Sequence, residues 1–402
     1  MPPTDFINAR ESKTATLVDD RPYLPELFVT KSTDADESPS SIHSHASLIS
    51  TALAIIFYDS SPPSNLAENL KVKTVTGGIT NALYAVSGFK PIQSYDTILI
   101  RVFGAEGMID RDVETSSFAA LAEQDIAPPY FGRFGNGRLE GWLDNYSPLV
   151  LMDFQTQKNS DAIAKKLAQL HYGYKVPSYL QKWYDHAEPG LWTQFNDWIN
   201  QAQNIDPRHG YASKGDADRA ERLIDLAKME RELSWLKESI ISPESKVAFC
   251  HNDLLPANIM KHGETGNIEF IDFEYGGINY IGFDIANHFN EHAGGPEKQS
   301  GEPDYSMFPS ASRQKFFITS YVQTSRSLST ENGNGNGHAT MEEEDIENLS
   351  KEVNGFVLAN HIYWGLWAVN QAAAEGTEEF DYLAYAWHRF NQYFENKEEF
   401  GY

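Results

Sequence analysis

The chain has 402 residues, enough for two domains of ordinary size, and 41% of them are hydrophobic, so a large core can form. It carries 57 Asp and Glu against 32 Lys and Arg, a net charge of −25, which argues against nucleic-acid binding because that function depends on surplus basic side chains. The single cysteine, Cys250, excludes an internal disulfide, and without a signal-like or membrane-length apolar stretch a cytoplasmic protein is expected.

The first part of the chain is predicted to be an extension followed by a small sheet. Residues 1–45 are rich in Ser, Asp, Thr and Pro, a composition that favours disorder over a packed core. Residues 46–145 predict a small lobe with a mostly antiparallel sheet and one helix. Its strands are expected at 71–76, 82–86, 97–102 and 138–143, and its helix begins near Asp110.

The remaining residues, 146–402, predict a larger and mainly helical lobe. Ser160 is a candidate helix N-cap, because Ile163, Leu167 and Leu170 fall on one helical face behind it. Residues 329–345 combine Asn-Gly repeats with an acidic run, and we expect a flexible insert there. Other helices are predicted at 217–238, 310–325, 346–373 and 377–396, and short strands at 246–250 and 268–271. The fold class is therefore α+β.

The strongest chemical signal is the segment 251–258, His-Asn-Asp-Leu-Leu-Pro-Ala-Asn, on a loop that leaves a strand. Asp253 precedes Asn258 by five positions, as the catalytic aspartate precedes the magnesium-binding asparagine in protein kinases. Asp272 follows fourteen residues later at the end of a strand, where a kinase has its second metal-binding aspartate. We expect Asp253 to orient the acceptor hydroxyl, and Asn258 and Asp272 to hold Mg²⁺ against the phosphates of ATP.

A glycine-rich hairpin and a strand-terminal arginine predict where ATP binds. The backbone N–H groups of the hairpin can approach a phosphate, although such hairpins are common. Arg101 ends the third strand, where a kinase has its phosphate-pairing lysine, and Glu114 is placed to hold it; two solvated surface charges are the alternative. No P-loop sequence is present, which argues against a P-loop kinase. The candidate residues in the hairpin are Gly77, Gly78, Thr80 and Asn81.

Together these segments resemble the choline/ethanolamine kinase family. The resemblance runs from about 71 to 394 and is carried by 251–258, 271–275, 279–280 and 283–291. Glu274, in place of the glycine of a kinase Asp-Phe-Gly, is typical of this family. The resemblance implies a two-lobed, protein-kinase-like fold, ATP and Mg²⁺ as cofactors, and a small amino alcohol as the substrate. The sequence does not determine the oligomeric state, for which a homodimer is one option.

The resemblance also implies an amine site, in which the ammonium group lies against aromatic rings and a carboxylate. Trp364 and Trp367 stand at i and i+3 of a predicted helix, on one face. Such a stripe can also be ordinary core, and this alternative stays open, most of all for Phe380. The residues implied to line the site are Tyr275, Glu291, Trp364, Trp367, Phe380 and Tyr385.

Details within the family favour ethanolamine as the acceptor. Leu254 and Leu255 stand where choline kinases more often have polar residues. Residues 289–294, Phe-Asn-Glu-His-Ala-Gly, are similar to an ethanolamine-type Phe-Asn-Glu-Phe-Ala-Gly, from which His292 departs. In the catalytic loop, Pro256 and Ala257 also depart from the residues common in ethanolamine kinases. The expected reaction is phosphorylation of ethanolamine to phosphoethanolamine, the first step of phosphatidylethanolamine synthesis. A choline kinase or a dual-specificity enzyme is the nearest alternative.

Other functions stay open at this point. An aminoglycoside phosphotransferase would share the architecture, but the tryptophan pair is not expected there. A metal-dependent hydrolase built on His251, Asp253, Asp272 and His288 would leave Arg101 unexplained. A catalytically silent amine- or nucleotide-binding protein is a further alternative, although silenced kinases tend to have lost a residue of the kind retained here.

Two residues near the catalytic loop are expected to be structural. Asp284 lies in an apolar context between Phe283 and Ile285, and we expect it to anchor the loop through backbone groups or His251. Cys250 adjoins His251, but adjacent strand residues point to opposite faces, so a buried thiol is expected instead of a nucleophile.

Overall fold

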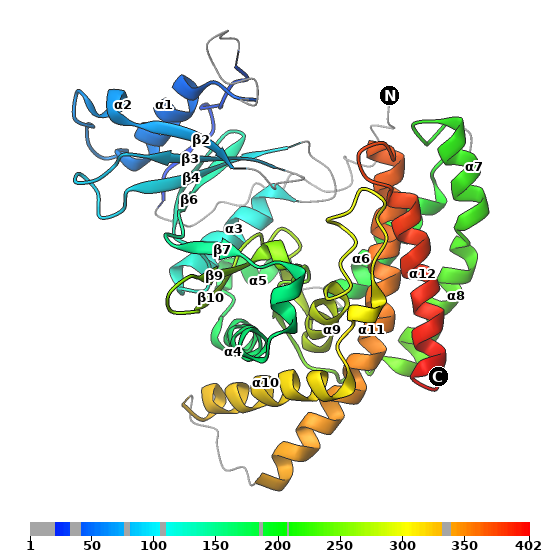
Figure 1. The fold of residues 1–402 in the computed structure, drawn as a ribbon. Helices are drawn as coiled ribbons and strands as arrows, with labels where there is room; N and C mark the ends of the chain where they lie inside the picture. The colour runs from blue at the N-terminus through cyan, green and yellow to red at the C-terminus, as the bar shows by residue number, and fades with distance from the viewer. Residues whose placement is uncertain are drawn as a thin grey trace. The chain divides into compact units, whose positions relative to one another are not determined.

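The computed structural model describes residues 21–32, 42–75, 81–104, 110–184, 188–206, 209–331 and 339–402 (Figure 1). The chain is α+β and divides into two compact units. The first comprises residues 1–144 and 176–183, and the second comprises 145–175 and 184–402. Among the helices of the described residues, none has the length and apolar character needed to cross a membrane.

The first unit is built on a six-stranded sheet in the order β1-β5-β6-β4-β3-β2. Strand β1 runs parallel to β5, and every other neighbouring pair is antiparallel. The strands are β1 (Tyr23–Leu24), β2 (Lys71–Val75), β3 (Asn81–Ser87), β4 (Thr97–Phe103), β5 (Tyr130–Phe134) and β6 (Gly137–Gly141). The helices are α1 (His45–Ile56), α2 (Leu66–Asn69) and α3 (Arg111–Glu123), and α5 (Ser178–Tyr184) covers most of the returning segment.

The two-residue period of strand β4 separates the core of this unit from its polar cluster. Ile98, Ile100 and Val102 are buried in one apolar core, which also holds residues of α1 and β3. Arg101 lies between them in sequence and so projects to the other face of the sheet, where it is also buried. The strand pattern therefore places a buried cation beside, and not inside, the apolar core.

The predicted extension, residues 1–45, is partly folded. Strand β1 pairs with β5, Lys31 forms a bridge with His43, and Val29 is buried in the apolar core of the first unit. The expectation of disorder is therefore wrong for 21–32 and 42–45, because a short strand and a few apolar side chains suffice to dock this segment. Residues 1–20 and 33–41 lie outside the described part of the chain.

The second unit contains two small sheets and most of the helices. One sheet has the strand order β10-β9-β7 and the other pairs β11 with β8. The strands are β7 (Tyr146–Pro148), β8 (Val247–Cys250), β9 (Ile259–His262), β10 (Ile268–Phe270) and β11 (Gly277–Tyr280). The α-helices are α4 (Gln157–Gly173), α6 (Gly190–Gln203), α7 (Lys214–Leu223), α8 (Leu226–Trp235), α9 (Ile281–Glu291), α10 (Ala311–Glu331), α11 (Ala339–Glu375) and α12 (Tyr382–Glu399). Shorter helical turns are η2 (Leu151–Gln155), η3 (Leu236–Ile240), η4 (Pro256–Asn258) and η5 (Tyr305–Met307).

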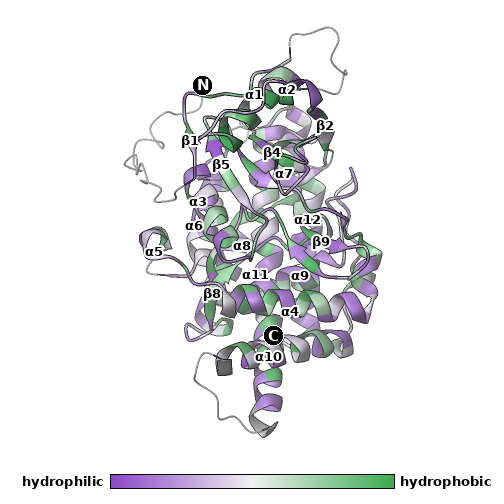
Figure 2. Ribbon diagram, turned by 90° about the vertical axis from the view of Figure 1, so that its left-hand side faces the viewer, coloured by the Kyte–Doolittle hydropathy of each residue, from purple (hydrophilic) through white to green (hydrophobic). Residues whose placement is uncertain are grey.

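Helix α9 is the centre of the second unit, because all eleven of its residues are buried. Helix α11 packs against α9, α12, α10 and α6, and α10 packs against α4. Figure 2 shows apolar and polar residues alternating along α4 and α10, as expected for helices with one buried face. The middle of α11 is instead buried on all sides around 356–366, so that polar residues there need partners inside the protein.

Several predicted boundaries differ from the structure. Helix α4 begins one turn before Ser160, because the side chain of Thr156 accepts a hydrogen bond from Asn159 N and caps it. The helix predicted at 217–238 is divided by Asp225, which caps α8. Helices α10 and α11 extend into the predicted insert, 329–345, from both sides, and residues 332–338 between them lie outside the described residues.

Candidate active site

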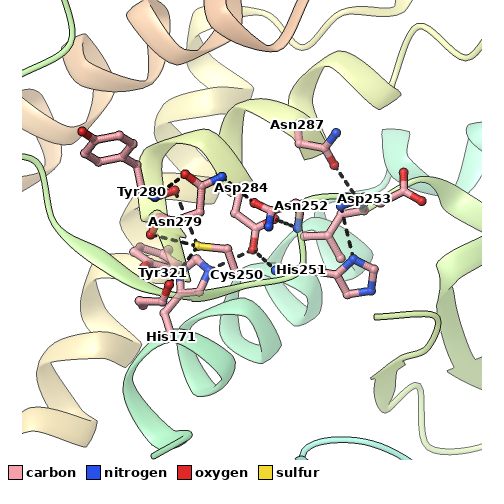
Figure 3. A network of polar contacts seen from close by, with 12 residues as sticks. His171, Cys250, His251, Asn252, Asp253, Asn279, Tyr280, Asp284, Asn287 and Tyr321 are labelled. Carbon is pink, nitrogen blue, oxygen red and sulfur yellow. Dashed lines mark hydrogen bonds and ion pairs between the residues drawn. The ribbon is translucent and has the colours of Figure 1, made fainter. Parts of the chain in front are cut away.

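Asp284 anchors the loop that follows strand β8 (Figure 3). The first two backbone N–H groups of this loop both donate to its carboxylate, His251 N to Oδ2 and Asn252 N to Oδ1, each at 2.7 Å. The ring of His171 on α4 lies with Nε2 3.0 Å from the same Oδ2. Burial raises the pKa of Asp284, but these contacts outweigh it and hold the pKa below its usual value. The expected anchoring role is therefore confirmed by the contacts.

The thiol of Cys250 is buried beside this anchor. Its Sγ lies 3.4 Å from Asn279 O, and burial raises its pKa well above the usual value, so it is a neutral thiol as expected. His171, Cys250 and Asp284 place possible ligand atoms within 4.8 Å of one another. Each is already hydrogen-bonded, His171 through Nδ1 to Tyr321 Oη at 2.7 Å, so we interpret the three as a structural cluster.

The turn at Asn252 is held by side chains from several elements. Its φ of 66° is in the left-handed region, which asparagine tolerates better than most residues. Its Nδ2 donates to Tyr275 O at 2.8 Å, and its Oδ1 accepts from Asn279 Nδ2 at 2.8 Å. Leu254 N donates to Asn287 Oδ1 on α9 at 2.6 Å. These bonds fix the backbone on both sides of Asp253.

The ring of His251 connects the two acidic segments of the site. Its Nδ1 accepts from Asp253 N at 3.3 Å, and its Nε2 lies 2.9 Å from Ile271 O. Burial lowers the pKa of His251, which favours the neutral ring that such a donor–acceptor pair of contacts requires. The position of Asp253 is thus tied to the residue that precedes Asp272.

The structure brings Asp253, Asn258 and Asp272 together. Asn258 Nδ2 donates to Asp253 O at 2.9 Å and to Asp253 Oδ2 at 3.0 Å. Ile271 N donates to Asn258 O at 3.0 Å, which continues the β9–β10 pairing and places Asp272 next to Asn258. The amide nitrogen of Asn258 contacts Asp253, and an amide oxygen such as Asn258 Oδ1 and a carboxylate such as that of Asp272 are the kinds of hard-oxygen ligand that Mg²⁺ prefers.

Asp253 is buried close to other carboxylates, which disfavour its ionised form. The pKa of Asp253 is raised well above its usual value, first by burial and then by the charges of Glu291, Glu274 and Asp272. A buried carboxyl group with negative neighbours favours its neutral form until positive charge arrives. A strongly shifted acid with specific charge neighbours is a common mark of a functional site.

Three of the expected amine-site aromatics form one cluster at α11. The rings of Tyr275 and Trp364 lie 5.3 Å apart and those of Trp364 and Trp367 5.4 Å apart, both edge to face. Trp367 Nε1 donates to Tyr275 Oη at 3.0 Å, which fixes the orientation of both rings. Such a rigid set of faces can bind a cation without losing side-chain entropy.

Phe380 and Tyr385 join this cluster through a residue that sequence reasoning missed. Phe380 lies 5.8 Å from Tyr385 and 4.8 Å from Tyr382, and Tyr382 lies 5.5 Å from Trp367, measured between ring centroids. The charges of Glu291 and Asp253 both act on Tyr385, whose pKa is raised mainly by burial. Tyr382 is the first residue of α12, and its link to α11 could not be seen from either helix alone.

Glu291 ends helix α9 and is buried. Its pKa is raised to about 7, first by burial and also by Glu297, against the opposing charge of Arg389. Arg389 Nη1 lies 3.7 Å from Glu291 Oε1. Sequence reasoning missed Arg389, because its contact with Glu291 joins α12 to α9, two helices that lie far apart in the sequence.

In the first unit, Arg101 belongs to a buried cluster of two arginines and two glutamates. Arg101 Nε and Arg138 Nε both donate to Glu140 Oε1 at 2.7 Å, and Arg138 Nη1 donates to Glu114 Oε1 at 2.5 Å. The two arginines lower the pKa of Glu140 to about 2, although burial alone would raise it. Glu114 contacts Arg138 in this cluster, and Glu140, which was not among the candidates, contacts both arginines.

The glycine-rich hairpin is mostly outside the described residues. Gly77, Gly78 and Thr80 fall in the segment 76–80, of which nothing can be described. Asn81 is the first residue of β3, is buried, and pairs with Phe103 of β4. Along β3, Asn81 lies two residues before Leu83, which is the partner of Arg101 on β4.

A protein-family model described as choline/ethanolamine kinase matches residues 72–394. The chain belongs to this family. Ethanolamine kinase 1 of Mus musculus is 35% identical over 332 residues, which cover 81% of this chain and 83% of the mouse protein. Among solved structures, an ethanolamine kinase from Plasmodium vivax is 26% identical with a TM-score of 0.68, covering 90% of this chain and 91% of that one. A choline kinase from Cryptosporidium parvum is 28% identical with a TM-score of 0.63, covering 88% and 95%.

Membership of the choline/ethanolamine kinase family confirms the predicted two-lobed, protein-kinase-like α+β fold. Of the predicted catalytic residues, Asp253, Asn258 and Asp272 lie in the second unit, as do the predicted amine-site residues. Arg101, Glu114 and Asn81 lie in the first unit, with Arg101 and Glu114 in one buried cluster.

Proposed function

We propose that this chain is an ethanolamine kinase, which transfers the γ-phosphoryl group of ATP to the hydroxyl of ethanolamine and yields phosphoethanolamine and ADP. The observation that supports this most is the meeting of Asp253, Asn258 and Asp272 beside a carboxylate and a cluster of aromatic rings, in a chain 35% identical to a mouse ethanolamine kinase. An acid that orients a hydroxyl, close to a site that binds a cation, matches a short amino alcohol, which carries a hydroxyl at one end and an ammonium group at the other. The reaction would begin a route to phosphatidylethanolamine.

Asp253 accepts a hydrogen bond from the substrate hydroxyl and takes its proton late in the transfer. Its backbone is held by His251 and its side chain by Asn258, so the carboxylate is oriented before substrate arrives. A substrate ammonium beside Glu291 adds positive charge to this acidic region, which lowers the pKa of Asp253 and shifts it toward its ionised form. Direct in-line transfer needs no covalent enzyme intermediate.

Asn258 Oδ1 and the Asp272 carboxylate are the ligands that we assign to Mg²⁺. Their chemistry fits a hard divalent cation, and the negative charges of Asp272, Glu274 and Glu291 all act on nearby Asp253. When bound, Mg²⁺ would neutralise charge on the β- and γ-phosphate oxygens of ATP. In the first unit, we assign Arg101 to the ATP phosphates, held by Glu140 and steadied by Glu114 through Arg138. The hairpin residues assigned to ATP are Gly77, Gly78, Thr80 and Asn81.

The ammonium end of the substrate lies against Trp364, Trp367 and Tyr275, with Glu291 as its counter-charge. A cation is attracted to the π-face of an aromatic ring, and the hydrogen bond from Trp367 to Tyr275 keeps these edge-to-face rings in place. Phe380 and Tyr385 complete the aromatic set.

A choline kinase, or an enzyme that accepts both amines, is the second candidate. The choline kinase structure from Cryptosporidium parvum has a TM-score of 0.63 to this chain, and aromatic faces bind quaternary ammonium groups well. The two candidates share fold and mechanism and differ only in the head group that the aromatic site accepts.

The test is steady-state ADP production with Mg·ATP, with ethanolamine, choline or no amine at matched concentrations. We expect a rate that depends strongly on ethanolamine and weakly on choline. A preference for choline would keep the mechanism and change the substrate, whereas no amine-dependent turnover would contradict the proposed function.

A further inference from the structure

Arg389 is a fully buried cation that the catalytic mechanism described above does not use. Its Nη2 donates to the backbone oxygen of Asn360 at 3.1 Å and to Asn360 Oδ1 at 2.5 Å. Within the described residues, its Nε and Nη1 have no hydrogen-bond partner. Leaving such groups unpaired in the core is costly, so their placement calls for a function.

The unpartnered end of Arg389 faces the amine site. Nη1 lies 3.7 Å from Glu291 Oε1, close enough for a strong charge interaction but too far for a hydrogen bond. Asn360, which holds the other end of the guanidinium, is itself fixed by Asn290, whose Nδ2 donates to Asn360 Oδ1 at 2.8 Å. Helices α9, α11 and α12 thus hold the arginine at a set distance from the carboxylate.

We propose that Arg389 is a positioning residue of the amine site, which favours the ionised form of Glu291 while leaving its oxygens free to receive the substrate ammonium. This inference rests on the proposed function, because it assigns a partner to the amine in the same site. A buried carboxyl group without a cation favours the neutral form, which would not attract an amine. A tight bidentate pair would instead occupy both oxygens, and the 3.7 Å separation avoids this.

The surroundings of Glu291 determine when it is charged. Arg389 on α12 favours the ionised form, whereas burial and Glu297 oppose it. Asp253 on the catalytic loop, Tyr385 on α12 and Tyr305 on η5 also face Glu291. His361 on α11 faces Arg389 and has its pKa lowered well below the usual value, first by burial, so it adds no positive charge. With the pKa of Glu291 at about 7, its charge changes over the neutral range.

The sign of the pH dependence follows from this balance. Ethanolamine binds the ionised carboxylate, so its affinity rises as pH rises through about 7 and levels off above it. Because only the ionised fraction is competent, binding at pH 8 should be roughly tenfold tighter than at pH 6. Proton release should accompany binding near pH 7. The primary ammonium of ethanolamine, like that of lysine, stays charged over this range.

The experiment is isothermal titration of the full chain with ethanolamine, without nucleotide, at pH 6, 7 and 8. For the wild type we expect the rise in affinity just described. Arg389→Gln should weaken binding at pH 7 by about fivefold or more and move the rise to higher pH, because the pKa of Glu291 loses its opposing cation. Arg389→Lys, which keeps the charge, should restore part of the affinity.

Matched variants separate this role from a purely structural one. Arg326→Gln removes an arginine from a surface pair with Asp345 and should leave the profile unchanged. In a Glu291→Gln background, Arg389→Gln should cause no further loss, because the carboxylate on which it acts is gone. A wild-type affinity that is equal at pH 6 and pH 8, or an Arg389→Gln protein with the wild-type profile, would overturn the inference. If the enzyme turns over ethanolamine and shows either result, only this inference fails; if ethanolamine neither binds nor turns over, the proposed function fails with it.

Discussion

Asp253 has three carboxylates near enough to raise its pKa, Glu291, Glu274 and Asp272, and it is buried among them. At the residue scale, the charges that act on Asp253 are therefore those of carboxylates. The proposed substrate and cofactor would each bring positive charge to this region, an ammonium group at Glu291 and a magnesium ion at Asp272. The same reasoning gives the aromatic rings of the proposed amine site their role, since they bind a cation without adding further negative charge.

Replacing Trp364 tests the aromatic part of the site. Trp364→Ala should raise the KM for ethanolamine roughly tenfold, because a desolvated cation–π contact contributes about 1–2 kcal/mol, while the KM for ATP changes little. Steady-state kinetics with each substrate varied in turn measures this. Trp387→Ala, which removes an exposed tryptophan from α12, is the matched control. An unchanged KM for ethanolamine in a folded Trp364→Ala protein would assign Trp364 to the core alone.

Individual residues of the catalytic loop could be predicted from the sequence, because they are close together in it. Asp253 and Asn258 are five positions apart, and the strand pairing that brings Asp272 to them joins neighbouring strands. Arg389 and Tyr382 could not be predicted in the same way. Their roles depend on how α12 packs against α9 and α11, and no local pattern specifies that packing.

At the scale of elements, α9 serves two ends of the site. Asp284, in its first turn, anchors the catalytic loop, and Glu291, its last residue, faces the amine. This fully buried helix therefore fixes the spacing between the anchor of the catalytic loop and the counter-charge. The role of Asp284 could be predicted because a lone aspartate in an apolar helix needs partners, and the backbone N–H groups of a nearby loop are the ones available.

Removing the anchor should affect both stability and catalysis. Asp284→Ala leaves the N–H groups of His251 and Asn252 and the ring of His171 without their acceptor. We expect the free energy of unfolding to fall by about 3 kcal/mol and kcat to fall more than the KM for ethanolamine rises. Chemical denaturation and steady-state kinetics measure the two effects. A variant with wild-type stability and kcat would show that the loop keeps its shape without Asp284.

At the scale of the whole molecule, the sequence predicted a β-rich part followed by a helical part, and the chain divides at residue 144, with 176–183 returning to the first unit. That return was not predicted, because nothing in the composition of 176–183 distinguishes it from the helical segments around it. The folded part of the N-terminal segment was missed for a related reason. Its polar composition indicates disorder, whereas its place depends on pairing with β5, far along the chain.

The measurement that tests the central claim most directly is phosphorus NMR of the full chain with Mg·ATP and ethanolamine, run beside Asp253→Ala. The wild type should form phosphoethanolamine in equal amount to ADP, which excludes simple ATP hydrolysis. Asp253→Ala should slow its formation by at least about 10²-fold while ATP binding, measured separately, is retained. ADP accumulating with inorganic phosphate in place of phosphoethanolamine, or a near-wild-type rate in Asp253→Ala, would contradict the account.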